Sequence, residues 1–106
     1  MGKGGNRHTI ILVQYDKSYN SRSFMDFQAV GMALDAVVKM YETKLKELNP
    51  GVPNIEYDIA RLYGYLDELH DICALVLDPS TNKYEPHDKQ WIKQKIYDQL
   101  RNSAAK

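Results

Sequence analysis

The chain has 106 residues, of which 43% are hydrophobic and 26% are charged, and its fourteen basic residues balance its fourteen acidic ones. These values exclude a disordered chain, and the zero net charge gives no argument for binding to nucleic acid. Cys73 is the only cysteine, which excludes an intrachain disulfide and a cysteine-rich zinc site. We therefore expect one globular domain of an intracellular protein, with no signal peptide and no membrane-spanning segment.

The first element is the most strand-like run of the chain, HTIILVQ at 8–14. Successive side chains of a strand point to opposite faces, so Ile11 and Val13 share one face while Ile10 and Leu12 share the other. Both faces are apolar, whereas an antiparallel sheet usually leaves one face polar. Periodicity alone does not tell which pair lies in the core.

A polar, turn-rich loop follows, and SRSFMDF at 21–27 predicts a short edge strand. From about Asp26 to Leu48, apolar residues recur at steps of three and four, which predicts one long amphipathic helix. The segment NPGVP at 49–53 ends this helix. The predicted apolar stripe consists of Val30, Leu34, Val37, Val38, Tyr41, Leu45 and Leu48.

A second helix is predicted after Asp58, whose carboxylate can cap the helix N-terminus. Gly64 falls on the face opposite the apolar one, and His70 falls on the apolar face. The predicted buried positions are Ile59, Leu62, Tyr63, Leu66 and Leu69.

The last third of the chain predicts a hairpin and a helix. The run ICALVL at 72–77 is a second strand with two apolar faces, and Tyr84 lies in a short return strand that Pro86 ends. Asp88 can cap a final helix. The predicted apolar positions of that helix are Trp91, Ile92, Ile96 and Leu100.

This order of elements predicts an α+β fold: a single four-stranded antiparallel sheet with three amphipathic helices on one face. The predicted domain spans 8–101, between a flexible lead-in at 1–7 and a flexible tail at 102–106. No predicted element remains to cover the other apolar face of the sheet, so we expect a second copy, related by a two-fold axis, to cover it. The amide of Gln14 suits the polar rim of such an interface, which favours its own face as the outer one. The predicted dimer-interface residues are Ile10, Leu12, Gln14, Leu75 and Tyr84.

No arrangement of residues predicts catalysis or a metal site. The pairs His70-Asp71 and His87-Asp88 lack the additional spaced ligands that metal sites need. Cys73 near His70 could form a nucleophile and base, but a thiol packed in the core of a buried strand explains Cys73 better. We therefore expect a protein without enzyme activity, cofactor or metal.

Direct RNA binding remains an alternative function. RNA-binding sheets carry aromatic residues within their strands, next to basic neighbours. Here most of the eight tyrosines fall on predicted helices or loops, and the strands are aliphatic. Core and rim packing therefore explains the tyrosines better than stacking on bases does.

Ser23 is a candidate phosphorylation site because Asp26 follows it by three residues, as acidic-directed kinases require. The alternative interpretation is a hydroxyl that caps the coming helix. A phosphate would add about −1.5 to −2 charge, which would be repelled by Asp26 or at a subunit contact. We therefore expect modification of Ser23 to alter dimer or partner affinity more than fold stability.

These segments together resemble the enhancer of rudimentary homolog family, and the resemblance runs from about His8 to Leu100. The final block is the most specific, since its spacing of Tyr, Pro, Lys, Trp and Ile is similar to the family's ending. The blocks that carry the resemblance, in chain order, are HTIILVQ, KMYE, NP, YDI and YEPHDKQWIKQKIY.

The resemblance implies a homodimer formed through the sheets, without enzyme activity or cofactor. It implies an adaptor, nuclear and cytoplasmic, that binds segments of proteins acting in RNA processing and in messenger-RNA or small-RNA regulation. It also places Ser23 at a family phosphorylation position, whereas Ala29 replaces a second serine that many members carry. The first loop, with Tyr15 and Tyr19, departs from the family, which leaves the identity of the partner open.

Overall fold

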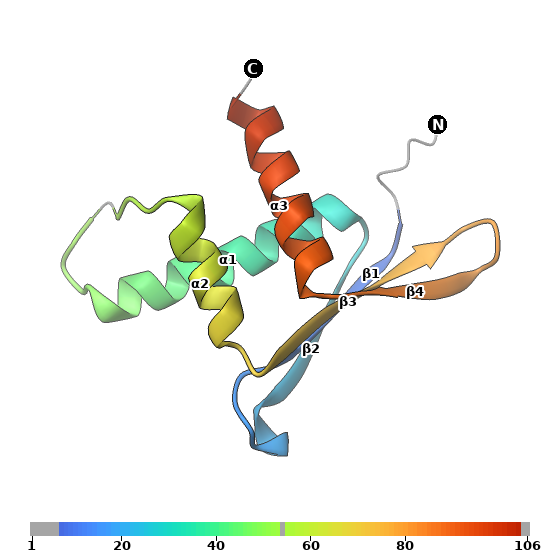
Figure 1. The fold of residues 1–106 in the computed structure, drawn as a ribbon, viewed down its shortest axis with the longest axis horizontal. Coiled ribbons are helices and arrows are strands. Elements are labelled where there is room, and N and C mark those ends of the chain that lie inside the picture. The colour runs from blue at the N-terminus through green and yellow to red at the C-terminus, as the bar shows by residue number, and fades with distance from the viewer. Residues whose placement is uncertain (1–6, 54, 105–106) are drawn as a thin grey trace.

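The structure, a computed structural model, describes residues 7–53 and 55–104, so most of the predicted lead-in lies outside the described residues. Along the described chain, two strands, two α-helices, two strands and a third α-helix follow one another, with a short 3-10 helix in the first loop (Figure 1). Their bounds are β1 Thr9–Gln14, η1 Tyr19–Ser21, β2 Arg22–Phe27, α1 Val30–Leu48, α2 Ile59–Glu68, β3 Asp71–Asp78, β4 Lys83–His87 and α3 Lys89–Ala104.

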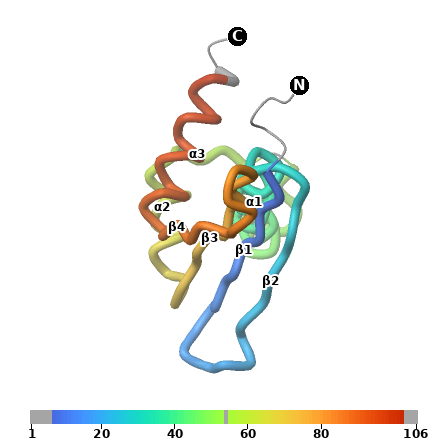
Figure 2. The backbone as a smooth tube through the Cα atoms, turned by 90° about the vertical axis from the view of Figure 1, so that its right-hand side faces the viewer, coloured from blue at the N-terminus to red at the C-terminus, as the bar shows by residue number. Residues whose placement is uncertain are grey.

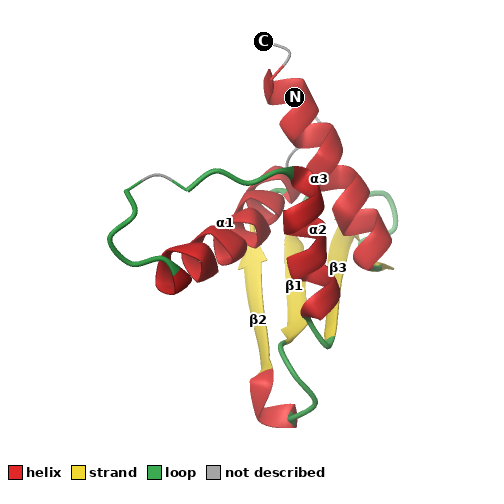
Figure 3. Ribbon diagram, turned by 60° about the vertical axis from the view of Figure 1, so that its left-hand side comes forward, coloured by secondary structure: helices red, strands yellow, loops and turns green. Residues whose placement is uncertain are grey.

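The four strands form one antiparallel sheet in the order β2-β1-β3-β4. All three helices cover the same face of this sheet (Figure 3), and the loop between β1 and β2 projects beyond them (Figure 2). The α+β class is therefore confirmed. Since β1 and β3 are central, their side chains decide what each face of the sheet presents.

The core lies between the sheet and the helices. Ile11 and Val13 are 0% and 3% exposed, so this pair of β1 faces the helices, as predicted. The same alternation in β3 puts its buried side chains on that face. The buried apolar residues from β3, the helices and the C-cap of α2 are Ala33, Leu34, Val37, Tyr41, Leu45, Leu62, Leu66, Leu69, Ile72, Ala74, Val76, Ile92 and Ile96.

The first helix starts later than predicted. Residues up to Phe27 pair with β1, and α1 begins at Val30 after an extended Ala29 that provides no side-chain cap. The ladder hydrogen bonds of β2 therefore override the helical periodicity that suggested a start near Asp26. The interpretation of Ser23 as a helix cap is wrong for the same reason, because Ser23 lies within β2.

The two predicted caps are confirmed. Asp58 accepts a hydrogen bond from the backbone N–H of Arg61 at 3.0 Å, and Asp88 accepts one from that of Trp91 at 3.0 Å. Each bond satisfies one of the free donors in the first turn of a helix.

Two predicted ends differ from the structure. β4 continues through Pro86 to His87, because β4 is an edge strand, where a residue without an N–H is tolerated. The final helix continues to Ala104, into the segment predicted as a tail, and residues 105–106 lie outside the described part.

Gly64 offers a direct test of how α2 is stabilised. Gly64 is exposed in the middle of the helix, and a Cβ added there would meet no atom within 4 Å. We expect Gly64→Ala to raise the free energy of unfolding by about 1 kcal/mol, because alanine loses less backbone entropy in a helix. Urea unfolding monitored by circular dichroism measures this change, and an unchanged midpoint would contradict it.

Candidate functional site

The outer face of the sheet, on the side away from the helices, is apolar over all four strands. Leu12 in the central β1 lies between Phe24 of β2 and Cys73 of β3. Leu12 is 39% exposed and Phe24 is 69% exposed, although both are large apolar side chains. The three described helices lie on the other face of the sheet (Figure 3), so none of them covers this row.

The row next to it continues the apolar surface. Ile10 pairs with Asp26 on one side and with Leu75 on the other, and Leu75 in turn pairs with Pro86. Beyond this row Leu77 pairs with Tyr84. We call this surface the outer face; its members are Ile10, Leu12, Phe24, Cys73, Leu75, Leu77, Tyr84 and Pro86.

The structure brings the five predicted interface residues onto one side of the sheet. Gln14 ends the β1 row, where its amide donates to the carbonyl of Asp16 at 2.8 Å and accepts from Nε of Arg22 at 3.1 Å. Sequence reasoning missed Phe24, Leu77 and Pro86, because only the strand register shows which side chains of different strands are neighbours. Whether a second copy covers this face stays a prediction.

Two residues lie elsewhere than predicted. Cys73 belongs to the outer face and not to the core, and partial burial raises the pKa of its thiol, with a smaller contribution from Asp71. His70 is exposed, because α2 ends at Glu68 and Leu69 has an extended backbone, so the helical phase does not reach His70. The prediction of a packed histidine was therefore wrong.

A polar chain closes one end of the outer face. Nδ1 of His8 lies 2.7 Å from the hydroxyl of Tyr84, and Nε2 of His8 lies 3.1 Å from a carboxylate oxygen of Asp26. The rings of His8 and Tyr84 meet edge to face, with centroids 5.8 Å apart. His8 therefore links β4 to β2 across the face of the two central strands.

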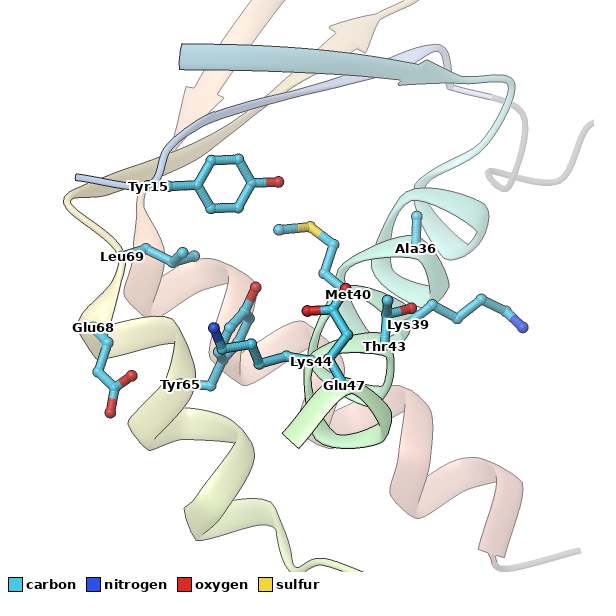
Figure 4. Close-up of a pocket in the computed structure, with 10 residues that line it drawn as sticks. All are labelled: Tyr15, Ala36, Lys39, Met40, Thr43, Lys44, Glu47, Tyr65, Glu68 and Leu69. Carbon is cyan, nitrogen blue, oxygen red and sulfur yellow. The ribbon is translucent and has the colours of Figure 1, made fainter. Parts of the chain in front are cut away.

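A groove of about 630 Å³ lies on the helical side of the molecule (Figure 4). Tyr15, Met40, Tyr65 and Leu69 provide its apolar surface, from the first loop, α1, α2 and the end of α2. Burial raises the pKa of the Tyr65 hydroxyl. The charged residues that line the groove are Lys39, Lys44, Glu47 and Glu68.

The described residues hold no group of three or more His, Cys, Asp and Glu side chains that could bind a metal ion. None of the described helices is both long and apolar enough to cross a membrane. The arrangement offers surfaces for binding: an apolar sheet face and a groove with a charged rim.

Ser23 lies on the other side of β2 from the outer face. It pairs with Val13, whose side chain faces the helices, and it is exposed at the edge of the sheet. Asp26 and Phe24 point to the outer face, so the predicted repulsion between a phosphate at Ser23 and Asp26 does not follow from this geometry.

We expect Ser23→Glu to leave the dissociation constant of the predicted dimer within about twofold of wild type and the unfolding free energy within about 0.5 kcal/mol. The reason is that the new charge is exposed and lies away from the outer face. Sedimentation equilibrium and urea unfolding measure the two quantities. A large loss of dimer would place Ser23 at the subunit contact after all.

Two layers, with one apolar sheet face left uncovered by the described chain, define a small α+β protein. The sequence model of a family described as enhancer of rudimentary matches residues 5–106. The chain is 50% identical over 99 residues to an enhancer of rudimentary homolog of Arabidopsis thaliana, covering 93% of this chain and 91% of the relative. It is 45% identical over 97 residues to the protein enhancer of rudimentary of Drosophila virilis, covering 92% and 93%. The chain therefore belongs to the enhancer of rudimentary family.

Proposed function

We propose that this protein is a non-enzymatic adaptor that acts as a homodimer and binds segments of RNA-processing or RNA-regulating proteins, in the nucleus and the cytoplasm. The exposed apolar outer face is the observation that supports the homodimer. Partners that act on RNA, and a link to gene regulation, rest on the resemblance described above.

Two copies that pack their outer faces together would remove the exposed apolar surface of both. An exposed apolar patch that spans several strands is uncommon on a monomer and marks an interaction site. A two-fold contact is self-complementary, so each copy covers the other with the same residues. Phe24 and Tyr84, which keep 69% and 42% of their surface exposed, and Leu12, which keeps 39%, are large side chains that this cover would bury.

The groove on the helical side would remain open in such a dimer, because it lies across the sheet from the outer face. Its apolar surface suits one aromatic or aliphatic side chain of a short partner segment, and its charged rim suits the polar residues beside it. Binding there requires no change in the fold of either copy.

A pull-down from native extract, followed by mapping with overlapping peptides of the proteins recovered, tests the adaptor function. Tyr15→Ala should weaken binding of a mapped peptide by about tenfold or more, since Tyr15 lines the groove and is 43% exposed. Tyr19→Ala is the matched control, because Tyr19 lies in the same loop, is 75% exposed and does not line the groove.

Equal losses in the two variants would remove the groove from the proposal. Tight binding of RNA by the purified protein alone, with affinity that falls steeply as salt rises, would support the alternative of a direct RNA-binding module.

A further inference from the structure

We infer that His8, together with Asp26 and Tyr84, makes association of two copies through the outer face depend on pH, with tighter association at lower pH. This inference rests on the proposed homodimer and adds a regulatory device to it. It follows from the positions of the three side chains and from their charges.

His8 can gain a proton without losing either of its hydrogen bonds. In the neutral form, Nε2–H donates to Asp26 and Nδ1 accepts from the Tyr84 hydroxyl, which fits the distances of 3.1 and 2.7 Å. In the protonated form both ring nitrogens donate, and the Tyr84 hydroxyl turns so that its oxygen accepts. The geometry therefore permits both charge states.

The net charge of the pair depends on that proton. With neutral His8, the pair of His8 and Asp26 carries one negative charge; with protonated His8, it is an ion pair of zero net charge. Other described charged residues at this end of the sheet lie on its helical side and not on the outer face. Asp78 and Lys83 pair on the helical side of the hairpin, and the hydrogen bonds from Ser80, with a smaller contribution from Arg7, lower the pKa of Asp78.

Association of two copies changes whether the neutral or the protonated form of His8 is favoured. In a single copy the side chains of His8 and Asp26 are 30% and 62% exposed, so water stabilises the carboxylate whether or not His8 is charged. A second copy on the outer face removes part of that water, and an uncompensated charge loses more by this than an ion pair does. Proton uptake by His8 therefore favours association.

Histidine is the side chain whose charge ordinarily changes between pH 5 and 8. Association that takes up protons becomes stronger as the pH falls through that range. Each copy contributes one such site, so a symmetric dimer contains two. We expect the dimer dissociation constant to be about 10- to 100-fold lower at pH 6 than at pH 8.

Sedimentation equilibrium of the full chain at pH 6 and pH 8, with circular dichroism as a check of folding, measures this effect. His8→Gln keeps a donor and an acceptor but cannot titrate, and its dissociation constant should be the same at both pH values. Asp26→Asn should give a tighter dimer than wild type at pH 8, and the pH dependence should disappear or reverse. His70→Gln is the matched control, since His70 is exposed and lies away from the outer face, and it should behave as wild type.

A wild-type dimer with equal dissociation constants at the two pH values, or one that weakens at pH 6, overturns the inference and leaves the homodimer standing. A His8→Gln protein that keeps the full pH dependence also overturns it. A wild-type chain that is monomeric at both pH values and at high concentration overturns the homodimer and, with it, this inference.

Discussion

Ile11→Arg should unfold the chain. Ile11 is 0% exposed, and it lies in β1 between the β2 and β3 strands, under the helices. An arginine at this position would bring an unpaired charge into an apolar core, at a cost of several kcal/mol. The total stability of a domain is about 5–15 kcal/mol, so most or all of it would be lost.

Circular dichroism and a thermal melt measure this outcome. Ile11→Val is the matched control, which removes one methylene group and should cost only about 0.5–1.5 kcal/mol. A cooperative melt of Ile11→Arg near the wild-type temperature would show that position 11 is not in the core.

The second large effect is expected from the double variant Ile10→Arg/Leu12→Arg, which should separate the two copies while each keeps its fold. Both residues lie on the outer face, so the charges of a single copy remain in water. In the dimer, four arginines would meet in an apolar seam, where desolvation opposes association.

The two positions are not equivalent. Ile10 pairs with Asp26, which could bind an arginine at position 10, whereas Leu12 is flanked by Phe24 and Cys73, which cannot. Leu12→Arg alone should therefore account for most of the effect. The introduced charge adds to the loss of the apolar contact that the exposed part of Leu12, 39% of its surface, would make in the dimer.

Sedimentation velocity gives the oligomeric state, and circular dichroism checks the fold of the separated copies. A double variant that remains a dimer would show that the outer face is not the subunit contact. A wild-type chain that stays monomeric at high concentration would also show that the outer face is not a subunit contact.

Local features of the sequence were enough to predict most elements. Asp58 and Asp88 cap helices because a carboxylate before a helix bonds to an N–H three residues on, which depends only on neighbouring residues. Alternation in 8–14 showed that both faces of the first strand are apolar, since the period of a strand is two. The family was recognisable from short blocks in order.

Features that depend on residues far apart in the chain were decided by the tertiary structure. Pairing with β1 made residues up to Phe27 a strand, although their local pattern also fitted a helix. The extended backbone at Leu69 placed His70 in solvent, and the strand register placed Cys73 on the outer face.

The sequence alone determined that both faces of the first strand are apolar. Only the tertiary structure decided that the helices cover Ile11 and Val13, which leaves Leu12 and its neighbours on other strands as one continuous surface. It also brought His8 within hydrogen-bond distance of Asp26 and Tyr84, 18 and 76 residues away. The physical reason is that strand periodicity is a property of adjacent residues, whereas burial and cross-strand contact depend on register and on the packing of distant elements.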